Sequence, residues 1–304
     1  MFVRFISELA RVQPVHVLSG PSSVRQRASD FLAGINNVTI HEMPTNDTWI
    51  RDYGPTFVKR CDDGALVGVD WQFNAWGGKY PPFDDDARAA QAICKLIGCP
   101  RSVSPMYCEG GALETDGAGT LLTTSSVLLS ATRNPGWTRE MVESELQRQL
   151  GVTNIIWVDG GGMLGDDTDG HIDQLARFVS PGVVVVAVSS RISDPNQAGL
   201  AENLRTIKQV KLLDGSSLEV HPLPTPPPRF IDQQRVPESY CNFLFANGAV
   251  LVPTFQSEET DRVALRLFEK LLPNRKVVPI DCCDLIWGRG ALHCASQHQP
   301  LAKL

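Results

Sequence analysis

Apolar residues recur at helical spacing in five segments of the chain, and a short apolar run of strand length follows each segment. The predicted helices cover residues 22–33, 84–96, 138–150, 196–212 and 258–272. The predicted strands cover residues 38–43, 101–107, 154–158, 218–223 and 277–280. Several of the helices open on Ser, Asp, Thr or Asn, which cap helix N-termini. The pattern therefore predicts one α/β unit that is used repeatedly along the chain.

Four of the five units continue into a β-hairpin whose turn contains glycine. The turns are predicted at residues 62–64, 116–119, 180–182 and 246–248. Glycine supplies the positive φ that such turns require. The fifth unit stops after one strand, predicted at 292–296, and we expect strand 14–18 and helix 22–33 to complete it. The repeat predicts a closed ring, built as a single domain over residues 1–304.

Composition and charge narrow the classes of function. The net charge of −6 disfavours a nucleic-acid surface, whose footprint is basic, and is compatible with a cationic substrate. No apolar run approaches the roughly 20 residues that cross a bilayer, and residues 1–11 form an amphipathic pattern without features of a signal peptide. The eight cysteines show neither a CxxC pair nor zinc-type spacing. We expect a cytoplasmic protein with free thiols and no bound metal, interacting with neither nucleic acid nor membrane.

In a closed ring, the polar segments that follow the five strands leave equivalent strand ends and meet near the axis. One of them carries Asp166, Asp167, Asp169, His171 and Asp173 within eight residues. A lone histidine near a strand start is usually structural. So many acids around it are costly together unless a cation is bound, which favours a binding site. On a strand, His171 and Asp173 would face the same side.

Other polar segments offer a thiol and further carboxylates. Asp52 forms either a surface ion pair with Arg51 or a buried acid at a strand entrance. Glu109 is either a solvated turn acid or a carboxylate that orients an imidazole. Trp71 and Trp76 would either wall the pocket or lie in the core.

Cys294 lies in the last polar segment. A cysteine in an apolar strand is usually a core thiol. Gly288 and Gly290, just before it, would let a ligand approach the backbone closely. His293 would face the opposite side of a strand, so we expect His171 to act as the base for the thiol.

Five motifs, read together, resemble those of agmatine deiminases and Porphyromonas-type peptidylarginine deiminases, in order from about the first helix to the last residues. They are NDTWIRDYGPTF at 46–57, FNAWGG at 73–78, EGG at 109–111, DTDGHID at 167–173 and HC at 293–294. The resemblance implies the five-bladed, pseudo-fivefold α/β propeller (pentein) of guanidino-group-modifying enzymes, with repeated ββαβ units. It implies no metal and no cofactor, and related enzymes often form homodimers.

The resemblance also implies roles for individual residues. Cys294 would be the nucleophile, His171 the general acid/base and Glu109 its support. The substrate-binding residues would be Asp52, Asp173, Asp167 and Trp76. The implied reaction converts agmatine, a precursor of putrescine in polyamine biosynthesis, to N-carbamoylputrescine and ammonia through an amidino-cysteine intermediate. A peptidyl-arginine deiminase, an amidinotransferase and a non-catalytic guanidine-binding homologue are the alternatives.

Two features depart from the family pattern. The family usually has Gly-Gly-Gly-Asn before Ile-His-Cys, whereas this chain has Arg289 and Ala291 in the stretch GRGALHC at 288–294. The loss of the Asn bears on substrate positioning more than on the chemistry. Family members also carry an N-terminal stretch with Trp-containing motifs ahead of the first helix, where this chain begins. We therefore expect either a truncated sequence or a ring with one edge built differently.

Overall fold

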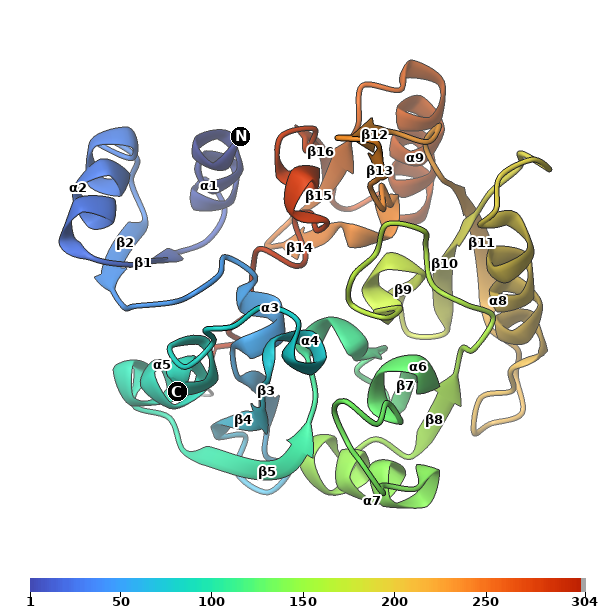
Figure 1. Cartoon of the computed structure of the whole chain (residues 1–304), viewed down its shortest axis with the longest axis horizontal. Coiled ribbons are helices and arrows are strands. Elements are labelled where there is room, and N and C mark those ends of the chain that lie inside the picture. Colours follow the sequence, from blue (N-terminus) through green and yellow to red (C-terminus); the bar gives the residue numbers. More distant parts are fainter. Residues whose placement is uncertain (302–304) are drawn as a thin grey trace.

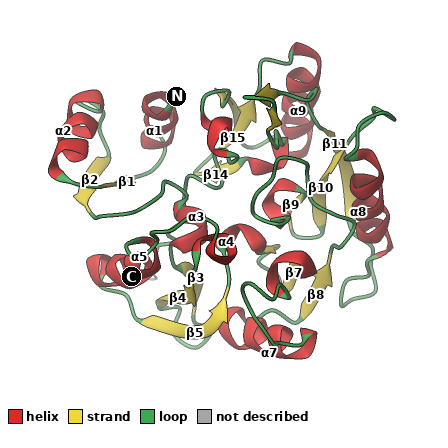
Figure 2. Ribbon diagram, viewed as in Figure 1, coloured by secondary structure: helices red, strands yellow, loops and turns green. Residues whose placement is uncertain are grey.

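The computed structural model describes residues 1–301, and its strands and helices form five units around a common centre (Figure 1). Four units share one topology, in which an antiparallel hairpin is followed by a helix and a third strand that pairs in parallel with the second strand of the hairpin. This is the predicted ββαβ unit. The helices lie on the outer side of the sheets (Figure 2).

The boundaries of the four complete units follow the predicted ones closely. The first two units contain β3 (Thr56–Lys59), β4 (Leu66–Gln72), α5 (Asp86–Ile97), β5 (Arg101–Tyr107), β6 (Glu114–Thr115), β7 (Thr120–Thr123), α7 (Arg139–Leu150) and β8 (Asn154–Trp157). The next two contain β9 (Ala176–Ser180), β10 (Val183–Val188), α8 (Gln197–Gln209), β11 (Glu219–Pro224), β14 (Leu244–Ala246), β15 (Ala249–Thr254), α9 (Glu258–Leu271) and β16 (Lys276–Asp281). The four predicted hairpins are therefore confirmed, as are the four helices and the four following strands predicted in these units. The helix predicted at 22–33 and the strand predicted at 38–43 are found as α2 and β2 in the fifth unit.

Local chemistry explains where several of these elements begin and end. Helix α7 begins after Thr138, whose side chain accepts a hydrogen bond from the backbone N–H of Met141. It ends at Gly151, and α5 ends at Gly98, both in the left-handed conformation that favours glycine. Strand β10 reads VVVVAV, and the four residues at its centre are fully buried between the helix and the ring centre. β-branched residues of this kind favour a strand that is covered on both faces.

The fifth unit is built differently from the other four. It contains α1 (Phe2–Ala10), β1 (Val15–Ser19), α2 (Ser22–Phe31) and β2 (Val38–Glu42), and β1 and β2 form a two-stranded parallel sheet. The prediction of a strand at 292–296 is wrong, because residues 292–295 form a turn with a hydrogen bond from Ala295 N to Ala291 O. The N-terminal unit still contacts the fourth unit through two hydrogen bonds. The Arg4 side chain donates to the carbonyl oxygen of Pro279, and Gln13 Oε1 accepts the backbone N–H of Asn247.

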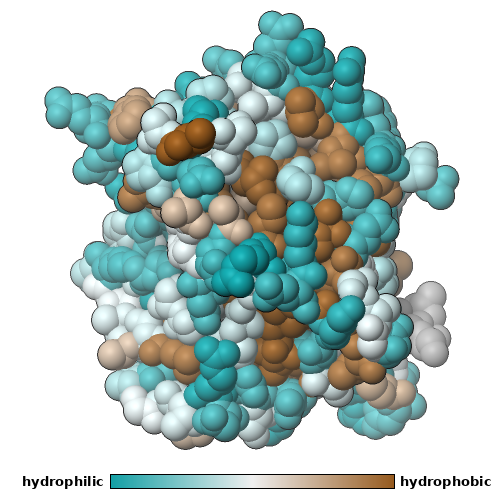
Figure 3. All heavy atoms as spheres, turned by 90° about the vertical axis from the view of Figure 1, so that its right-hand side faces the viewer, coloured by the Kyte–Doolittle hydropathy of each residue, from teal (hydrophilic) through white to brown (hydrophobic). Residues whose placement is uncertain are grey.

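Smaller elements lie within the units and between them. They are α3 (Ile50–Tyr53), α4 (Ala75–Gly78), α6 (Ser125–Leu128), η1 (Gly110–Ala112), η2 (Ile172–Gln174), η3 (Tyr240–Asn242), η4 (Leu285–Gly288) and the hairpin of β12 (Phe230–Ile231) and β13 (Gln234–Arg235). Residues His171 and Asp173 were predicted on a strand, but they lie at the start and within the 3-10 helix η2. On the face seen in Figure 3, apolar residues gather in a band between hydrophilic regions. Within residues 1–301, no helix has the length and apolar character to cross a membrane.

A buried ion pair joins three units near the centre of the ring. Arg177 on β9 pairs with Glu114 on β6, and it also donates hydrogen bonds to the carbonyl oxygens of Cys241 and Phe243. The second carboxylate oxygen of Glu114 accepts the backbone N–H of Phe178 at 2.9 Å. Both side chains are less than 9 % exposed. All polar groups of this carboxylate are therefore paired, as a charge in the interior requires.

We expect Glu114→Gln to lower the free energy of unfolding by about 3–5 kcal/mol, because it leaves the Arg177 charge buried without its counterion. Chemical denaturation followed by circular dichroism measures the loss. Glu202 and Arg205 form a matched pair on the exposed surface of α8, and Glu202→Gln should lose far less. Equal losses in the two variants would contradict a structural role for the buried pair.

Candidate active site

Five short turns of backbone bring residues from all five units to the ring centre. They are α3, η1, η2, η3 and the turn at 292–295, and each follows the last strand of a unit. Within these turns, or at the residue just before them, lie Asp52, Glu109, His171 with Asp173, Asn242, and Cys294, respectively. None of these six residues is more than 6 % exposed. The structure therefore brings together, in one buried cluster, residues that are up to 242 positions apart in the sequence.

His171 lies between two carboxylates. Its Nδ1 is 3.7 Å from Asp52 Oδ1, and its Nε2 is 3.7 Å from Glu109 Oε2. These distances suit ion pairs but are too long for hydrogen bonds. Neither imidazole nitrogen, nor Oδ1 of Asp173, has a hydrogen-bond partner among the described residues. Because buried polar atoms are normally paired, three unpaired ones at one point indicate a binding site for a polar ligand.

The carboxylates set the charge of this imidazole. Burial lowers the pKa of His171, but Asp52, Glu109 and Asp173 together outweigh it and raise that pKa to about 9. Burial raises the pKa of Asp173 to about 7, with His171 opposing the shift, and it also raises the pKa of Asp52. At neutral pH the centre thus holds a protonated imidazole beside acids that a further cation would help to ionise.

Asp52 is held in place by two donors. Its Oδ2 accepts the indole N–H of Trp76 at 2.9 Å, and its Oδ1 accepts the backbone N–H of Gly111 at 2.9 Å. Ala75 and Trp76 both adopt left-handed backbone conformations, with φ of 53° and 56°. Such conformations are uncommon for bulky residues and are retained where the surroundings require them. Here the conformation aims the indole at Asp52.

Glu109 is held by a buried arginine. Arg133 Nε lies 2.7 Å and 3.0 Å from the two carboxylate oxygens, and the guanidinium also bonds to Asp169 at 2.8 Å. Burial raises the pKa of Glu109, but His171 and Arg133 outweigh it, so the net shift is downward. Glu109 is therefore an ionised partner for His171.

Cys294 lies on the other side of the cluster. Its Sγ is 3.4 Å from Asp173 Oδ2 and accepts the side-chain N–H of Asn242 at 3.0 Å. Burial, then Asp173 and Asp52, raise the pKa of the Cys294 thiol well above its usual range, and the Asn242 donor opposes them. In this arrangement the thiol is protonated until a cation enters the site.

The structure corrects the predicted position of His293. Its Nδ1 is 2.8 Å from Asp173 Oδ2, the same oxygen that the Cys294 sulfur approaches. In a turn, adjacent side chains are not forced to opposite faces as they are in a strand. Burial, then Arg177 and Arg51, lower the pKa of His293, so the neutral ring donates its Nδ1–H to Asp173.

Asn242 is a residue of the site that the sequence analysis missed. Its Oδ1 accepts the backbone N–H groups of Ala291, His293 and Cys294 at 3.2, 3.0 and 3.2 Å. One side chain therefore shapes the turn that presents the sulfur. The repeat held the signal that could have found it, because η3 occupies the same place in its unit as η1 and η2 do in theirs.

The glycines of the site make room for side chains. A Cβ on Gly111 would lie 2.5 Å from His171 Nδ1 and 2.8 Å from Asp52 Oδ1. A Cβ on Gly288 or Gly290 would lie 2.5 or 2.6 Å from the Trp49 indole. The expectation that these two glycines admit a ligand is therefore wrong, because an aromatic ring fills the space beside them.

The remaining predicted residues lie farther out. Asp167 is partly exposed, and its Oδ2 accepts the hydroxyl of Tyr80 at 2.6 Å. Tyr80 packs edge-on against Trp76 with 5.7 Å between ring centroids. Trp71 lies in the core and donates its indole N–H to Thr56, so Trp76 is the tryptophan of the site. Within residues 1–301, no group of three or more His, Cys, Asp and Glu side chains is arranged to hold a metal ion.

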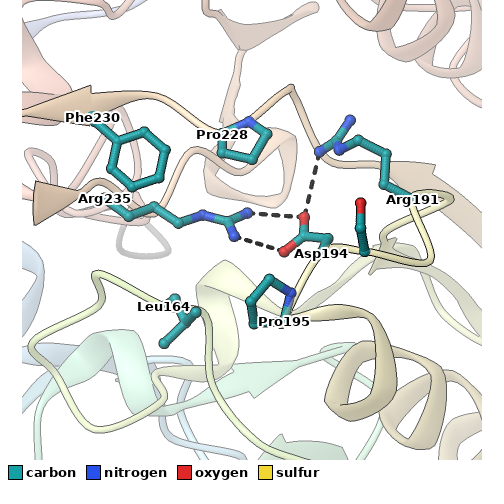
Figure 4. A pocket seen from close by; sticks show the side chains of 8 residues that line it. Leu164, Arg191, Asp194, Pro195, Pro228, Phe230 and Arg235 are labelled. Carbon is teal, nitrogen blue, oxygen red and sulfur yellow. Dashed lines mark hydrogen bonds and ion pairs between the residues drawn. The ribbon is translucent and has the colours of Figure 1, made fainter.

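A separate cavity of about 490 Å³ lies outside this cluster, between the α8 unit and the β12–β13 hairpin (Figure 4). Asp194 lies at its centre and pairs with Arg235 at 2.6 Å and with Arg191 at 3.5 Å. The Arg235 hydrogen bond is the main cause that lowers the pKa of Asp194. Because this acid is already neutralised, the cavity offers no free carboxylate to a cation and is not the candidate site.

A five-bladed α/β propeller with a cysteine, a histidine and carboxylates at its axis is the arrangement expected of enzymes that modify guanidino groups. The family model for Porphyromonas-type peptidyl-arginine deiminase matches residues 1–300. The chain belongs to this family.

Named relatives and solved structures agree with this membership. The chain is 36 % identical over 299 residues to a putative agmatine deiminase of Legionella pneumophila strain Paris, covering 98 % of this chain and 85 % of the relative. It is 34 % identical over 321 residues to an agmatine deiminase of Pseudomonas syringae pv. tomato, covering 98 % and 86 %. The structure matches an agmatine deiminase of Enterococcus faecalis with a TM-score of 0.91 and 30 % identity, covering 98 % of this chain and 86 % of that one.

We expect Asn242→Asp to slow alkylation of Cys294 by iodoacetamide about tenfold at a fixed pH and to move the pH profile up by about one unit. The variant keeps an oxygen for the three backbone donors but places a second oxygen, instead of an N–H group, against the sulfur. Peptide mass spectrometry of the Cys294 peptide measures the rate.

Asn203 supplies the matched control. It is fully buried on α8 and bonds to the Gly160–Gly161 backbone, away from the sulfur. Asn203→Asp makes the same chemical change and should leave the alkylation profile in place. If both variants shift the profile equally, the effect is structural and the contact between Asn242 and Cys294 does not tune the thiol.

Proposed function

We propose that this protein hydrolyses the guanidino group of agmatine to N-carbamoylputrescine and ammonia. The observation that carries the proposal is the buried cluster in which His171 lies between Asp52 and Glu109 while the Cys294 sulfur lies beside Asp173. Membership of the deiminase family, and the relatives named agmatine deiminase at 34–36 % identity, support the same reaction.

The carboxylates would hold the reacting group. A guanidinium is a planar, permanently charged cation whose N–H groups match carboxylate oxygens in pairs. Asp52 and Asp173 are proposed to accept these bonds, and Oδ1 of Asp173 has no other partner among residues 1–301. Trp76, which fixes Asp52, forms part of the wall. Bound in this way, the cation lowers the free energy of the ionised acids and of the Cys294 thiolate.

The chemistry follows from that binding. The Cys294 thiol releases its proton to solvent as the cation enters, and the sulfur attacks the central guanidinium carbon. His171, protonated at neutral pH, gives its proton to the nitrogen that departs as ammonia, which leaves an amidino-cysteine. The neutral imidazole then takes a proton from water, whose oxygen attacks the same carbon. The C–S bond breaks, the ureido product leaves and the thiol is restored, while Glu109 stabilises the charged imidazole.

Burial of the centre favours a small linear substrate over a peptide-linked arginine. Cys294 is only 6 % exposed, so the reacting carbon has to reach it through a narrow approach. Asp167 lies at the outer end of the wall formed by Trp76 and Tyr80, where it is proposed to pair with the distal ammonium of agmatine. An amidinotransferase of the same fold would need an amine acceptor in place of water.

We further propose that the protein works in the cytoplasm as a single-domain homodimer. The eight cysteines are all free, which is typical of a reducing compartment. Light scattering of the purified protein measures the assembly state, and a monomeric mass would contradict the homodimer.

We expect the purified protein to release ammonia from agmatine and Cys294→Ser to reduce the rate by a factor of at least about 1000, because a hydroxyl is a far weaker nucleophile here. A coupled ammonia assay measures turnover, and mass spectrometry of acid-quenched protein detects the amidino adduct on Cys294. Cys241→Ser is the control, since that buried thiol lies outside the site. A folded protein that releases no ammonia from agmatine, arginine or peptidyl-arginine would refute the proposal. Turnover only with added amines would indicate an amidinotransferase.

The pH dependence should follow Asp173 and His171. Below about 7, Asp173 is protonated and neutral, so it cannot pair with the substrate cation; kcat/KM should therefore fall with decreasing pH. Above about 9, His171 loses the proton that it gives to ammonia, and kcat/KM should fall again. The decrease of kcat at low pH should be smaller than that of kcat/KM, because the bound cation lowers the pKa of Asp173. An acid limb at an ordinary carboxyl pKa of about 4 would contradict this assignment.

A further inference from the structure

Arg289 forms an ion pair at the outer end of the proposed substrate path. Its Nε lies 3.7 Å from Asp167 Oδ2, and its other nitrogens bond to Gln234 Oε1 at 2.6 Å and to Gly165 O at 3.5 Å. Among the described residues, Asp167 is the one carboxylate that pairs with Arg289. The guanidinium is therefore positioned by neutral groups on one side and faces Asp167 on the other.

A continuous set of contacts connects this pair to the buried centre. The Trp76 indole donates to Asp52, its ring packs against Tyr80, and the Tyr80 hydroxyl donates to Asp167. Exposure rises along this path from 5 % at Trp76 to 45 % at Tyr80. A guanidino group held at Asp52 therefore directs the rest of a linear substrate along the two aromatic rings, toward Asp167 and Arg289.

The other charges near Asp167 are already paired. Lys79 forms an ion pair with Asp169 at 2.7 Å and donates to the backbone oxygen of Asp167. Asp166 accepts hydrogen bonds from Thr168 and from the backbone N–H of Gly170. Arg289 and Asp167 are left as the charged groups that can change partners, and both side chains are partly exposed, at 30 % and 22 %.

We propose that Arg289 determines which distal group the enzyme accepts. In the empty site Arg289 pairs with Asp167, and it therefore competes with the ammonium of an incoming substrate for that carboxylate. It also offers its own positive charge to a substrate carboxylate. The protein therefore hydrolyses guanidino carboxylates as well as agmatine. Its preference for a substrate with a distal cation is weaker than Asp167 alone would give. This inference rests on the proposed function, because it concerns the same site and the same reaction.

The backbone makes Arg289 a clean position for substitution. It has φ of 67° and lies between Gly288 and Gly290 in a left-handed conformation that favours glycine over arginine. Arg289→Gly therefore removes the charge without adding backbone strain. Arg289→Lys keeps a positive charge at the same place. Neither substitution touches Cys294, His171 or the acids that hold the guanidinium.

The test compares three substrates of similar length in the wild-type protein and both variants. Agmatine has a distal ammonium, 4-guanidinobutyrate a distal carboxylate and butylguanidine neither. In Arg289→Gly we expect kcat/KM to rise about fivefold for agmatine and to fall about fivefold for 4-guanidinobutyrate, mainly through KM. Butylguanidine should change less than about twofold, since it pairs with neither charge. Arg289→Lys should retain the wild-type order, and high salt should narrow the differences between variants.

The outcomes separate the inference from the proposed function. If agmatine is hydrolysed but the ratio of kcat/KM for agmatine to that for 4-guanidinobutyrate is unchanged in Arg289→Gly, the specificity role is refuted and the deiminase activity stands. If all three substrates change by the same factor, Arg289 is structural and the inference is likewise refuted. If wild-type protein releases no ammonia from any of the three, it is the proposed function that fails.

Discussion

The buried cluster of carboxylates around His171 is the constraint on which the rest of the structure depends. Three acids and one imidazole without full hydrogen bonding are expensive to take out of water, and they persist only because fixed groups support them. Arg133 neutralises Glu109, while Trp76 and the Gly111 backbone hold Asp52. At His171 and Asp173, polar atoms remain without hydrogen-bond partners among the described residues, so part of the desolvation free energy is not compensated. A bound guanidinium has the charge and the shape to compensate it.

The ring explains how one chain can assemble such a polar, buried centre. Each unit ends in a single turn at the axis, so five turns contribute one or two polar groups each, and none has to place several acids close together on its own. Structural charges lie one layer further out, where Glu114 and Arg177 connect neighbouring units. Asn242 performs the corresponding task for the Cys294 turn, because it gathers backbone donors from that turn onto one oxygen.

The spacing of apolar residues and the glycine-containing turns predicted the helices, strands and hairpins, because these signals extend over many residues. The details of the centre depend on three-residue turns, which carry no periodic signal and cannot be told from strand ends by pattern alone. This is why His293 was placed on the wrong side and Asn242 was missed. Gly290 shows a related limit of sequence analysis. A glycine indicates that another group packs closely against the backbone, but it does not identify that group, which here is the Trp49 indole.

The nucleophile itself follows from these constraints. Reactive cysteines are usually activated by a neighbouring positive charge, yet the groups nearest the Cys294 sulfur are Asp173 and the neutral amide of Asn242. Two carboxylates and burial hold the thiol in its protonated form, and one amide donor opposes them. The missing positive charge has to come from the ligand. A neutral or anionic compound that reached the sulfur would meet a largely protonated thiol and react slowly, so the arrangement that selects a cationic guanidino group is the same one that generates the thiolate.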